Sequence, residues 1–202
     1  MRHMEAIAAE QLNVQPAPGA AQYPALDLAN SVVALTSGQS VDLLDTPVAA
    51  GQWLAGHDLA PAAAVLDGDD AARLHGLRAH IRSLIDSSIH GGPASEDALD
   101  ALNDALTGAP SAALLSWNPI SGLHRTVARP RSEIVDHALA RLASDAADLL
   151  TGADAERLTA CGSNPCNRYL LRHGRRHWCS TRCGDRARAA RAYARRTRSA
   201  TP

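Results

Sequence analysis

Four cysteines near the C-terminal end carry the spacing in this chain that most clearly indicates chemistry. They follow the pattern C-x4-C-x12-C-x3-C and are the only cysteines among the 202 residues: Cys161, Cys166, Cys179 and Cys183. Two close pairs separated by about a dozen residues can present four thiolates to one tetrahedral zinc ion. The sequence therefore predicts one structural zinc site, with no ligand position left open for catalysis.

Two other uses of cysteine fit the sequence less well. A pair of disulfides needs an oxidising compartment, and we recognise no signal peptide. A thioredoxin-type redox pair would be C-x2-C, a spacing that does not occur here. His173 and His177 could each replace a cysteine as a ligand, but four thiolates already complete the tetrahedron. Structural zinc is thus the preferred interpretation.

The residues between and after the cysteines must bring the two pairs together. Short apolar runs at 169–171 and 177–178 lie on either side of Gly174, which predicts a hairpin. A helix capped by Ser180 would follow, and it would place the second cysteine pair on one face. The predicted order of knuckle, hairpin and helix resembles the treble-clef type of zinc finger.

Charge is distributed unevenly along the chain. Residues 161–198 contain 11 Arg and one acidic residue, whereas residues 1–160 contain 9 Arg and 20 acidic residues. The chain has no lysine, and its net charge of −1 conceals this asymmetry. A basic segment beside a zinc site predicts a negatively charged partner, and double-stranded DNA is the one we prefer.

A helix over about 181–198 would carry arginines every three or four residues along one side, opposite a packing side of alanines and Tyr193. Such a row suits phosphates and the O6/N7 edge of guanine. Arg186 falls on the packing side and is expected to pack on the finger. The predicted DNA-contacting residues of the turn and the helix are Arg175, Arg176, Arg182, Arg188, Arg191, Arg195, Arg196 and Arg198.

The segments WCS (178–180) and CGDR (183–186), followed by an Arg-rich helix, resemble the CGNR zinc finger. That module occurs at the C-terminus of bacterial proteins described as stress-induced transcription regulators. The resemblance implies a zinc-dependent, DNA-binding function for residues 153–202. Asp185 stands where the family has Asn, which adds a negative charge beside the zinc site without changing its ligands.

The rest of the chain is predicted to be mainly α, of the α+β class, with one β-hairpin. Residues 1–22 are expected to be a flexible arm, and residues 23–152 a helical domain. Helices are predicted at 24–35, from 46–47 to about 56, at 69–90, 95–106 and 132–150, and hairpin strands at 112–117 and 123–129. Arg82 is expected to pair with Asp86 four residues on.

The order of the motifs LDLANS (26–31), DLL (42–44), WL (53–54) and ALNDAL (101–106), followed by the hairpin, resembles the ABATE domain that precedes CGNR fingers. The resemblance implies a mainly helical domain that senses something. Asn30 and Trp53 are its candidate ligand-contacting residues. The more usual role for each is structural, with Asn30 holding a neighbouring backbone group and Trp53 anchoring the core.

Together these observations predict a cytoplasmic DNA-binding regulator with one structural zinc ion. Its expected partners are double-stranded DNA, a small-molecule ligand or protein for the N-terminal domain, and a second copy of the chain, with no membrane. The alternative is an interaction module whose basic finger docks on an acidic protein surface. RNA binding is disfavoured because exposed aromatic candidates are few. No nucleophile motif or Gly-rich phosphate loop indicates an enzyme.

Overall fold

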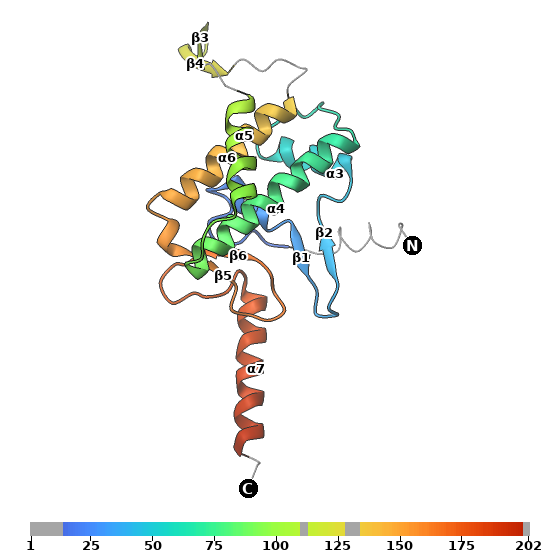
Figure 1. Ribbon diagram of the computed structural model, residues 1–202, viewed down its shortest axis with the longest axis vertical. Coiled ribbons are helices and arrows are strands. Elements are labelled where there is room, and N and C mark those ends of the chain that lie inside the picture. The colour runs from blue at the N-terminus through green and yellow to red at the C-terminus, as the bar shows by residue number, and fades with distance from the viewer. Residues whose placement is uncertain (1–13, 110–112, 128–133, 200–202) are drawn as a thin grey trace.

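The computed structural model describes residues 14–109, 113–127 and 134–199. The fold is mainly helical, with three small antiparallel strand pairs among these residues. Figure 1 shows a helical body, a hairpin at one end and a long helix at the other. The helices of the body are α2 (Pro24–Ala29), α3 (Pro47–Gly56), α4 (Gly68–His90), α5 (Glu96–Gly108) and α6 (Ile134–Thr151).

The long helix α4 lies at the centre of the body. It begins where Asp67 and Asp70 form a reciprocal capping box, and it ends at Gly91, whose left-handed conformation closes the last turn. One face of α4 packs on α5 and α6, and α2 and α3 also contact it. Leu74, Ile81 and Ile85, which recur at helical spacing along α4, are buried. Helix α3 begins after Thr46, whose side chain accepts a hydrogen bond from the Ala49 amide.

The predicted helix over 24–35 is wrong in its second half. Helix α2 ends at Ala29, and strand β1 (Val32–Ala34) pairs with strand β2 (Ser40–Asp42). Two successive β-branched valines favour a strand. The side chain of Asn30, which follows the helix, is moreover used by a distant segment of the chain.

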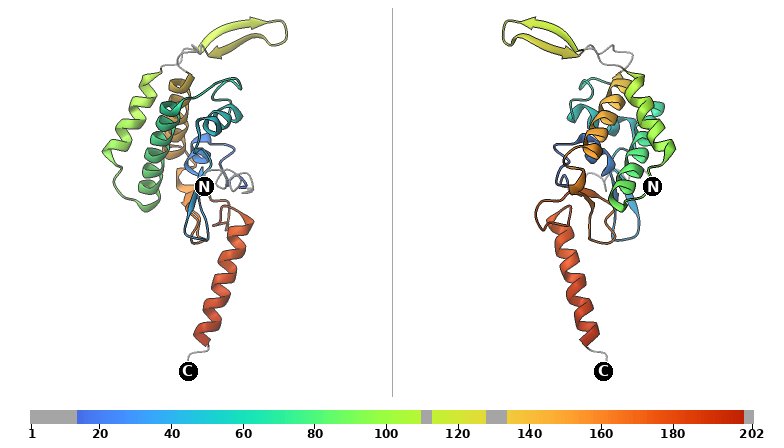
Figure 2. Two further views of the ribbon diagram at one scale, coloured as in Figure 1. Left: turned by 90° about the vertical axis from the view of Figure 1, so that its right-hand side faces the viewer. Right: turned by 60° about the vertical axis from the view of Figure 1, so that its left-hand side comes forward.

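The hairpin predicted between 112 and 129 is confirmed over the described residues. Strand β3 (Ala113–Asn118) pairs with strand β4 (Gly122–Val127), with Trp117 opposite Leu123. The hairpin projects from the body, as Figures 1 and 2 both show. Trp117 and Leu123 are consequently exposed. Ser132, where the following helix is predicted to begin, lies outside the described residues.

The hairpin predicted within the cysteine spacer is wrong. Strand β6 (Tyr169–Leu171) pairs instead with strand β5 (Leu158–Ala160), which precedes the first cysteine and follows the short 3-10 helix η2 (Ala155–Arg157). All three residues of β6 are buried, and Leu158, Tyr169 and Leu171 belong to the core of the body. The strand pair therefore ties the finger to the helical domain.

Residues 14–22 do not extend freely as an arm. The Leu171 amide donates to the Pro18 carbonyl (2.8 Å), and Ala17 is buried among the finger residues. Gly19 has φ +94, and a Cβ at this position would lie 2.6 Å from the Leu171 side chain. The segment thus fits closely against β6. Residues 1–13 of the expected arm lie outside the described residues.

Helix α7 (Thr181–Ser199) follows the cysteines and projects from the body at the end opposite the β3–β4 hairpin (Figures 1 and 2). Its first turns pack on the finger, where Ala187 is buried. Beyond them the expected packing side remains exposed, including Tyr193. Among the described residues, no helix is both long and apolar enough to cross a membrane.

Candidate metal centre and nucleic-acid interface

The structure brings all four cysteines into one cluster. Cys161 follows β5, Cys166 closes the knuckle before β6, and Cys179 and Cys183 enclose the start of α7. Their sulfur atoms lie within 4.8 Å of one another. The Sγ atoms of Cys166 and Cys179 are 3.6 Å apart, as are those of Cys179 and Cys183. The two predicted pairs therefore face each other.

These sulfurs match the donor set of a structural zinc ion. With Zn–S bonds of about 2.3 Å, the sulfurs of a tetrahedral site lie about 3.8 Å apart. All four cysteines are free thiols rather than disulfides. Hydrogen bonds from Cys166 and Cys179 lower the pKa of the Cys161 thiol, and the same hydrogen bonds to Cys161 raise the pKa of Cys166 and of Cys179. The protein thus holds one structural zinc, whose charge would stabilise all four thiolates.

Groups around the cysteines hold the sulfurs in place. The Cys179 amide donates to the Cys161 Sγ (3.4 Å), and the Ser180 hydroxyl caps α7 by accepting from the Cys183 amide (3.2 Å). Arg186 donates to the Ser163 hydroxyl (3.0 Å) and to the Cys183 Sγ (3.3 Å). The packing role predicted for Arg186 is confirmed, and its positive charge offsets part of the negative charge of a four-thiolate site.

Trp178 forms a platform for two arginines of the predicted stripe. The guanidinium carbons of Arg188 and Arg191 lie 5.8 and 5.5 Å from the centroid of its ring. Arg188 also forms an ion pair with Asp185, the residue that stands in place of the family Asn. Stacking on Trp178 restricts the positions of these two guanidinium groups, although both side chains remain exposed.

The other predicted DNA-contacting residues are exposed as well. Arg175 and Arg176 lie in the turn that precedes Trp178, and Arg176 donates to the Trp178 carbonyl (3.1 Å). On α7 itself the remaining exposed arginines are Arg182, Arg195 and Arg196. The side chain of Arg198 lies outside the described residues. The turn and the helix thus present basic groups at the same end of the molecule as the cysteine cluster.

The two candidate ligand-contacting residues have structural partners. The Asn30 amide nitrogen donates to the Tyr169 carbonyl (3.0 Å), and its oxygen accepts from the Tyr169 amide (2.7 Å). Asn30 is only 2% exposed. It therefore closes β6 of the finger onto α2 rather than facing a ligand site.

Trp53 contacts Asp27 of the same LDLANS segment. Its indole nitrogen donates to the Asp27 carboxylate (3.0 Å), which also accepts from His57 Nε2 at 3.3 Å. The hydrogen bond to Asp27 raises the pKa of His57 above its ordinary value, against the effect of burial. Burial raises the pKa of Asp27, but the hydrogen bonds from His57 and Trp53 outweigh it and leave that pKa lowered. Trp53 is thus part of a charged, hydrogen-bonded cluster that joins α2 to α3.

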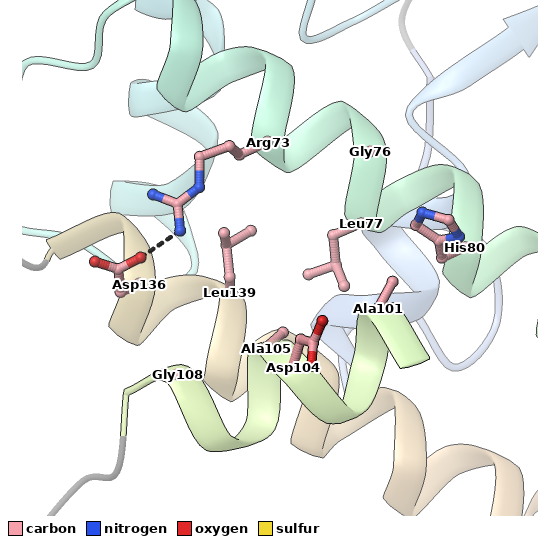
Figure 3. Close-up of a pocket in the computed structure, with 10 residues that line it drawn as sticks. All are labelled: Arg73, Gly76, Leu77, His80, Ala101, Asp104, Ala105, Gly108, Asp136 and Leu139. Atoms are coloured by element: carbon pink, nitrogen blue, oxygen red, sulfur yellow. Dashed lines mark hydrogen bonds and ion pairs between the residues drawn. The ribbon is translucent and has the colours of Figure 1, made fainter. Parts of the chain in front are cut away.

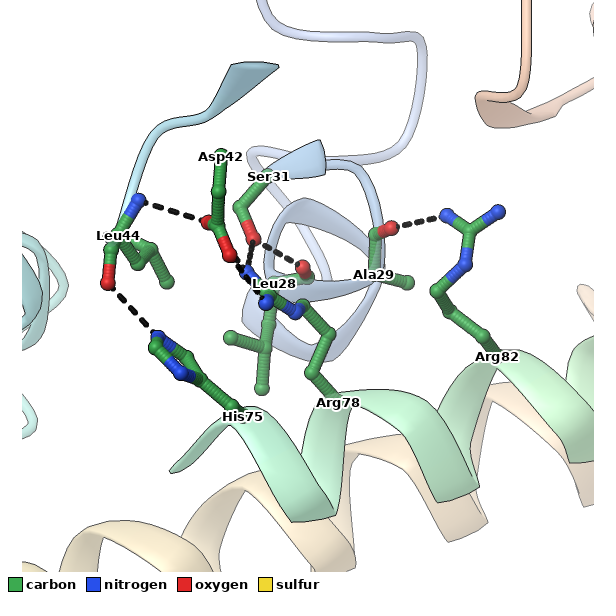
Figure 4. Close-up of polar contacts among 8 residues, drawn as sticks. All are labelled: Leu28, Ala29, Ser31, Asp42, Leu44, His75, Arg78 and Arg82. Atoms are coloured by element: carbon green, nitrogen blue, oxygen red, sulfur yellow. Dashed lines mark hydrogen bonds and ion pairs between the residues drawn. The ribbon is translucent and has the colours of Figure 1, made fainter. Parts of the chain in front are cut away.

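A polar network that the sequence does not predict connects α4 to the end of α2 and to β2 (Figure 4), and Arg82 extends it to the finger. Arg78, only 7% exposed, donates to the Asp42 carboxylate and to the Ser31 hydroxyl. Arg82 does not pair with Asp86 as expected, but donates to the carbonyls of Ala29 and Asn167. Arg82 lies within reach of the finger because β6 is packed on the body. Arginine spacing on a helix contains no signal for such partners.

Comparison with known protein families agrees with this geometry. Residues 22–153 match the family model ABATE, described as "Putative stress-induced transcription regulator", and residues 157–196 match the CGNR zinc finger. None of the curated proteins matches the chain significantly. Since the ABATE match covers more than half of the sequence, the chain belongs to the ABATE family and carries a C-terminal CGNR zinc finger.

Proposed function

We propose that this family member is a cytoplasmic, zinc-dependent regulator whose α7 and preceding turn bind double-stranded DNA. The body, residues 23–152, would sense a ligand or a protein partner and adjust how residues 153–202 meet DNA. A sensed molecule can do so only by binding one arrangement of the finger better than another. The DNA-contacting surface of the regulator is thus the basic end of the molecule.

The observation that carries the proposal is the exposed basic row on a helix that projects from the body. Nineteen residues of α-helix extend for about 28 Å. The DNA major groove, about 12 Å wide, accommodates such a helix. The zinc cluster anchors its first turn, and Trp178 orients Arg188 and Arg191. Arginine in this setting can bind phosphates and pair with guanine.

The ion pair of Arg188 with Asp185 makes Arg191 the sharper residue to test. We expect Arg191→Ala to weaken duplex binding by the zinc-loaded protein, and each lost phosphate contact to reduce the slope of log K against log salt by about 0.9. If Arg191 reads a guanine, the change costs about 1–3 kcal/mol and relaxes specificity at one base pair. Fluorescence anisotropy of a labelled duplex, selected from a random library, at three salt concentrations measures both effects.

The matched control is Arg125→Ala on β4. Arg125 is also exposed, but it lies on the hairpin at the opposite end of the molecule (Figure 1). We expect its replacement to leave the affinity and the salt slope unchanged. Absence of duplex binding by the zinc-loaded wild type at low salt would overturn the proposal. If Arg191→Ala alters self-association instead, as measured by analytical ultracentrifugation, the finger is an interaction module.

A further inference from the structure

A cavity of about 320 Å³ opens between α4, α5 and α6, away from the zinc cluster. Figure 3 shows it bordered by Leu77 of α4, Leu139 of α6 and two alanines of α5. Polar groups stand at its margins: the ion pair of Arg73 with Asp136 on one side, and His80 and Asp104 on the other. An apolar floor with a few polar groups at the edge is the usual composition of a small-molecule site.

Gly76, in the middle of α4, has no evident role in the fold. A Cβ at this position would meet no atom within 4 Å, and its φ lies outside the left-handed region. Glycine inside a helix is less stable than alanine by about 1 kcal/mol. Neither close packing nor a left-handed backbone therefore explains why position 76 is a glycine. Because Gly76 lines the cavity, its lack of a side chain leaves that wall of the cavity open.

The charges at the cavity favour a cation. One arginine, Arg73, faces two aspartates, and it is already paired with Asp136. Among the residues that line the cavity, which also include His80, this leaves Asp104 as the carboxylate without an arginine partner, and Figure 3 shows it pointing from α5 toward the space between the helices. Helix α5 adds further acidic residues and no basic one. A carboxylate beside an apolar surface suits an ammonium group attached to an apolar body.

We propose that this cavity is a binding site for a small organic ammonium compound, with its apolar body over Leu77 and Leu139 and its ammonium group at Asp104. The volume equals that of about ten water molecules at about 30 Å³ each. A compound of about ten non-hydrogen atoms therefore fills it.

The position of the cavity on α4 gives the ligand a route to the finger. The same helix carries Arg82, which donates to the Asn167 carbonyl within the zinc finger. The guanidinium carbon of Arg82 also lies 4.7 Å from the centroid of the Tyr169 ring. A ligand that shifts α4 against α5 and α6 shifts this contact. The coupling, unlike the binding, rests on the proposed DNA-binding function, and it requires DNA to change ligand affinity by the same factor.

The test uses the full-length, zinc-loaded, 15N-labelled protein and three ammonium probes: phenethylamine, hexylamine and cadaverine. In 1H–15N spectra, phenethylamine and hexylamine should shift the amide signals of residues around 76, 104 and 139 in a saturable way. Cadaverine, which lacks an apolar end, and 3-phenylpropionate, which reverses the charge, should bind at least about tenfold more weakly. No saturable shift with either apolar amine, or equal binding of 3-phenylpropionate, overturns the site.

Two variants locate the binding. Gly76→Leu fills the cavity and Asp104→Asn removes its charge, and each should weaken phenethylamine binding by about tenfold or more. Gly56→Leu is the control, because a Cβ at Gly56 also meets no atom within 4 Å but lies in α3. Unchanged binding in Asp104→Asn contradicts the proposal even if Gly76→Leu fails to fold. Duplex binding is measured separately, so a protein that binds phenethylamine but no DNA would overturn the proposed function and leave the cavity site standing.

Discussion

Helices α4 and α7 are both long and both rich in arginine, but they use it in opposite ways. On α4, Arg78 is buried against Asp42 and Ser31, and Arg82 donates to two backbone carbonyls. On α7, every described arginine except Arg186 is exposed. The difference lies in what each helix faces, because α4 crosses a body that surrounds it with acceptors, whereas most of α7 projects away from the body.

This contrast supports the proposed role of α7. A buried arginine that is paired with a carboxylate is shielded from an external partner, and its charge is a structural element. The arginines of α7 have a single carboxylate on their own helix, Asp185, and it pairs with Arg188. An excess of exposed positive charge contributes little to stability and much to attraction of an anionic partner.

The largest effect is expected from Cys179→Ser, which removes a zinc ligand. Zinc binding contributes about 10–16 kcal/mol to small fingers at neutral pH, so the start of α7 should lose its anchor. We expect no stoichiometric zinc in atomic emission analysis, lower helicity by circular dichroism and a lower Tm of the body. Ser180→Ala is the control, since it removes only a helix cap worth about 1 kcal/mol. A variant that keeps one zinc per chain would contradict the four-thiolate site.

Arg78→Met should have the next largest effect, and it tests α4. The half-buried Asp42 carboxylate would lose its cation, which costs about 3 kcal/mol, the lower end of the range for buried pairs. Urea denaturation followed by circular dichroism measures the loss. Arg196→Met, on the exposed side of α7, should change stability by no more than about 0.5 kcal/mol. Equal costs for the two substitutions would erase the distinction between the helices.

Asn30→Ala tests the contact between the body, which contains α4, and the finger, from which α7 projects. It leaves the Tyr169 amide and carbonyl without their partners, and we expect a loss of about 2 kcal/mol in the free energy of unfolding. Asn103→Ala, at an exposed position of α5, is the control and should be nearly neutral. If both variants unfold at the same urea concentration, the body and the finger are not joined through Asn30.

The smallest effect concerns pH. The pKa of His57 is raised in the folded protein, so its pair with Asp27 contributes fully below about pH 6.5 and is lost as pH rises through the folded pKa. The lowered pKa of Asp27 adds stability above about pH 4, which is lost as pH falls through its folded value. Urea midpoints should therefore decline from pH 6 to pH 8.5 in the wild type and decline less in His57→Gln. Arginine does not titrate in this range, so the arginines of α7 should contribute nothing to this change in the urea midpoint.

Local signals in the sequence predicted the elements that depend on local chemistry. The spacing of the cysteines, the cap at Thr46 and the apolar period of α4 each describe interactions within a few turns, and the structure contains all three. The location of Arg186 on the packing side of α7 also follows from helical periodicity alone.

The wrong predictions concern residues whose partners lie far away in the sequence. Tyr169–Leu171 has the composition of a hairpin strand, but composition does not reveal that its partner is Leu158–Ala160 rather than the residues after Gly174. Residues 14–22 have no periodicity, and they are positioned by Leu171 and Ala17 contacts that only the folded chain creates. Arg78 reads as a surface residue because its acceptor, Asp42, is 36 positions away.

The pairing of Asn30 with Tyr169 joins residues 139 positions apart, which sets an order for folding during synthesis. At about 5–20 residues per second, the ribosome needs about 7–28 s to make the intervening chain. Throughout that interval the surfaces of α2 and α4 that pack on β6 and β5 lack these strands. Completion of the core therefore waits for residues 158–171, which reach the body together with the first two zinc ligands.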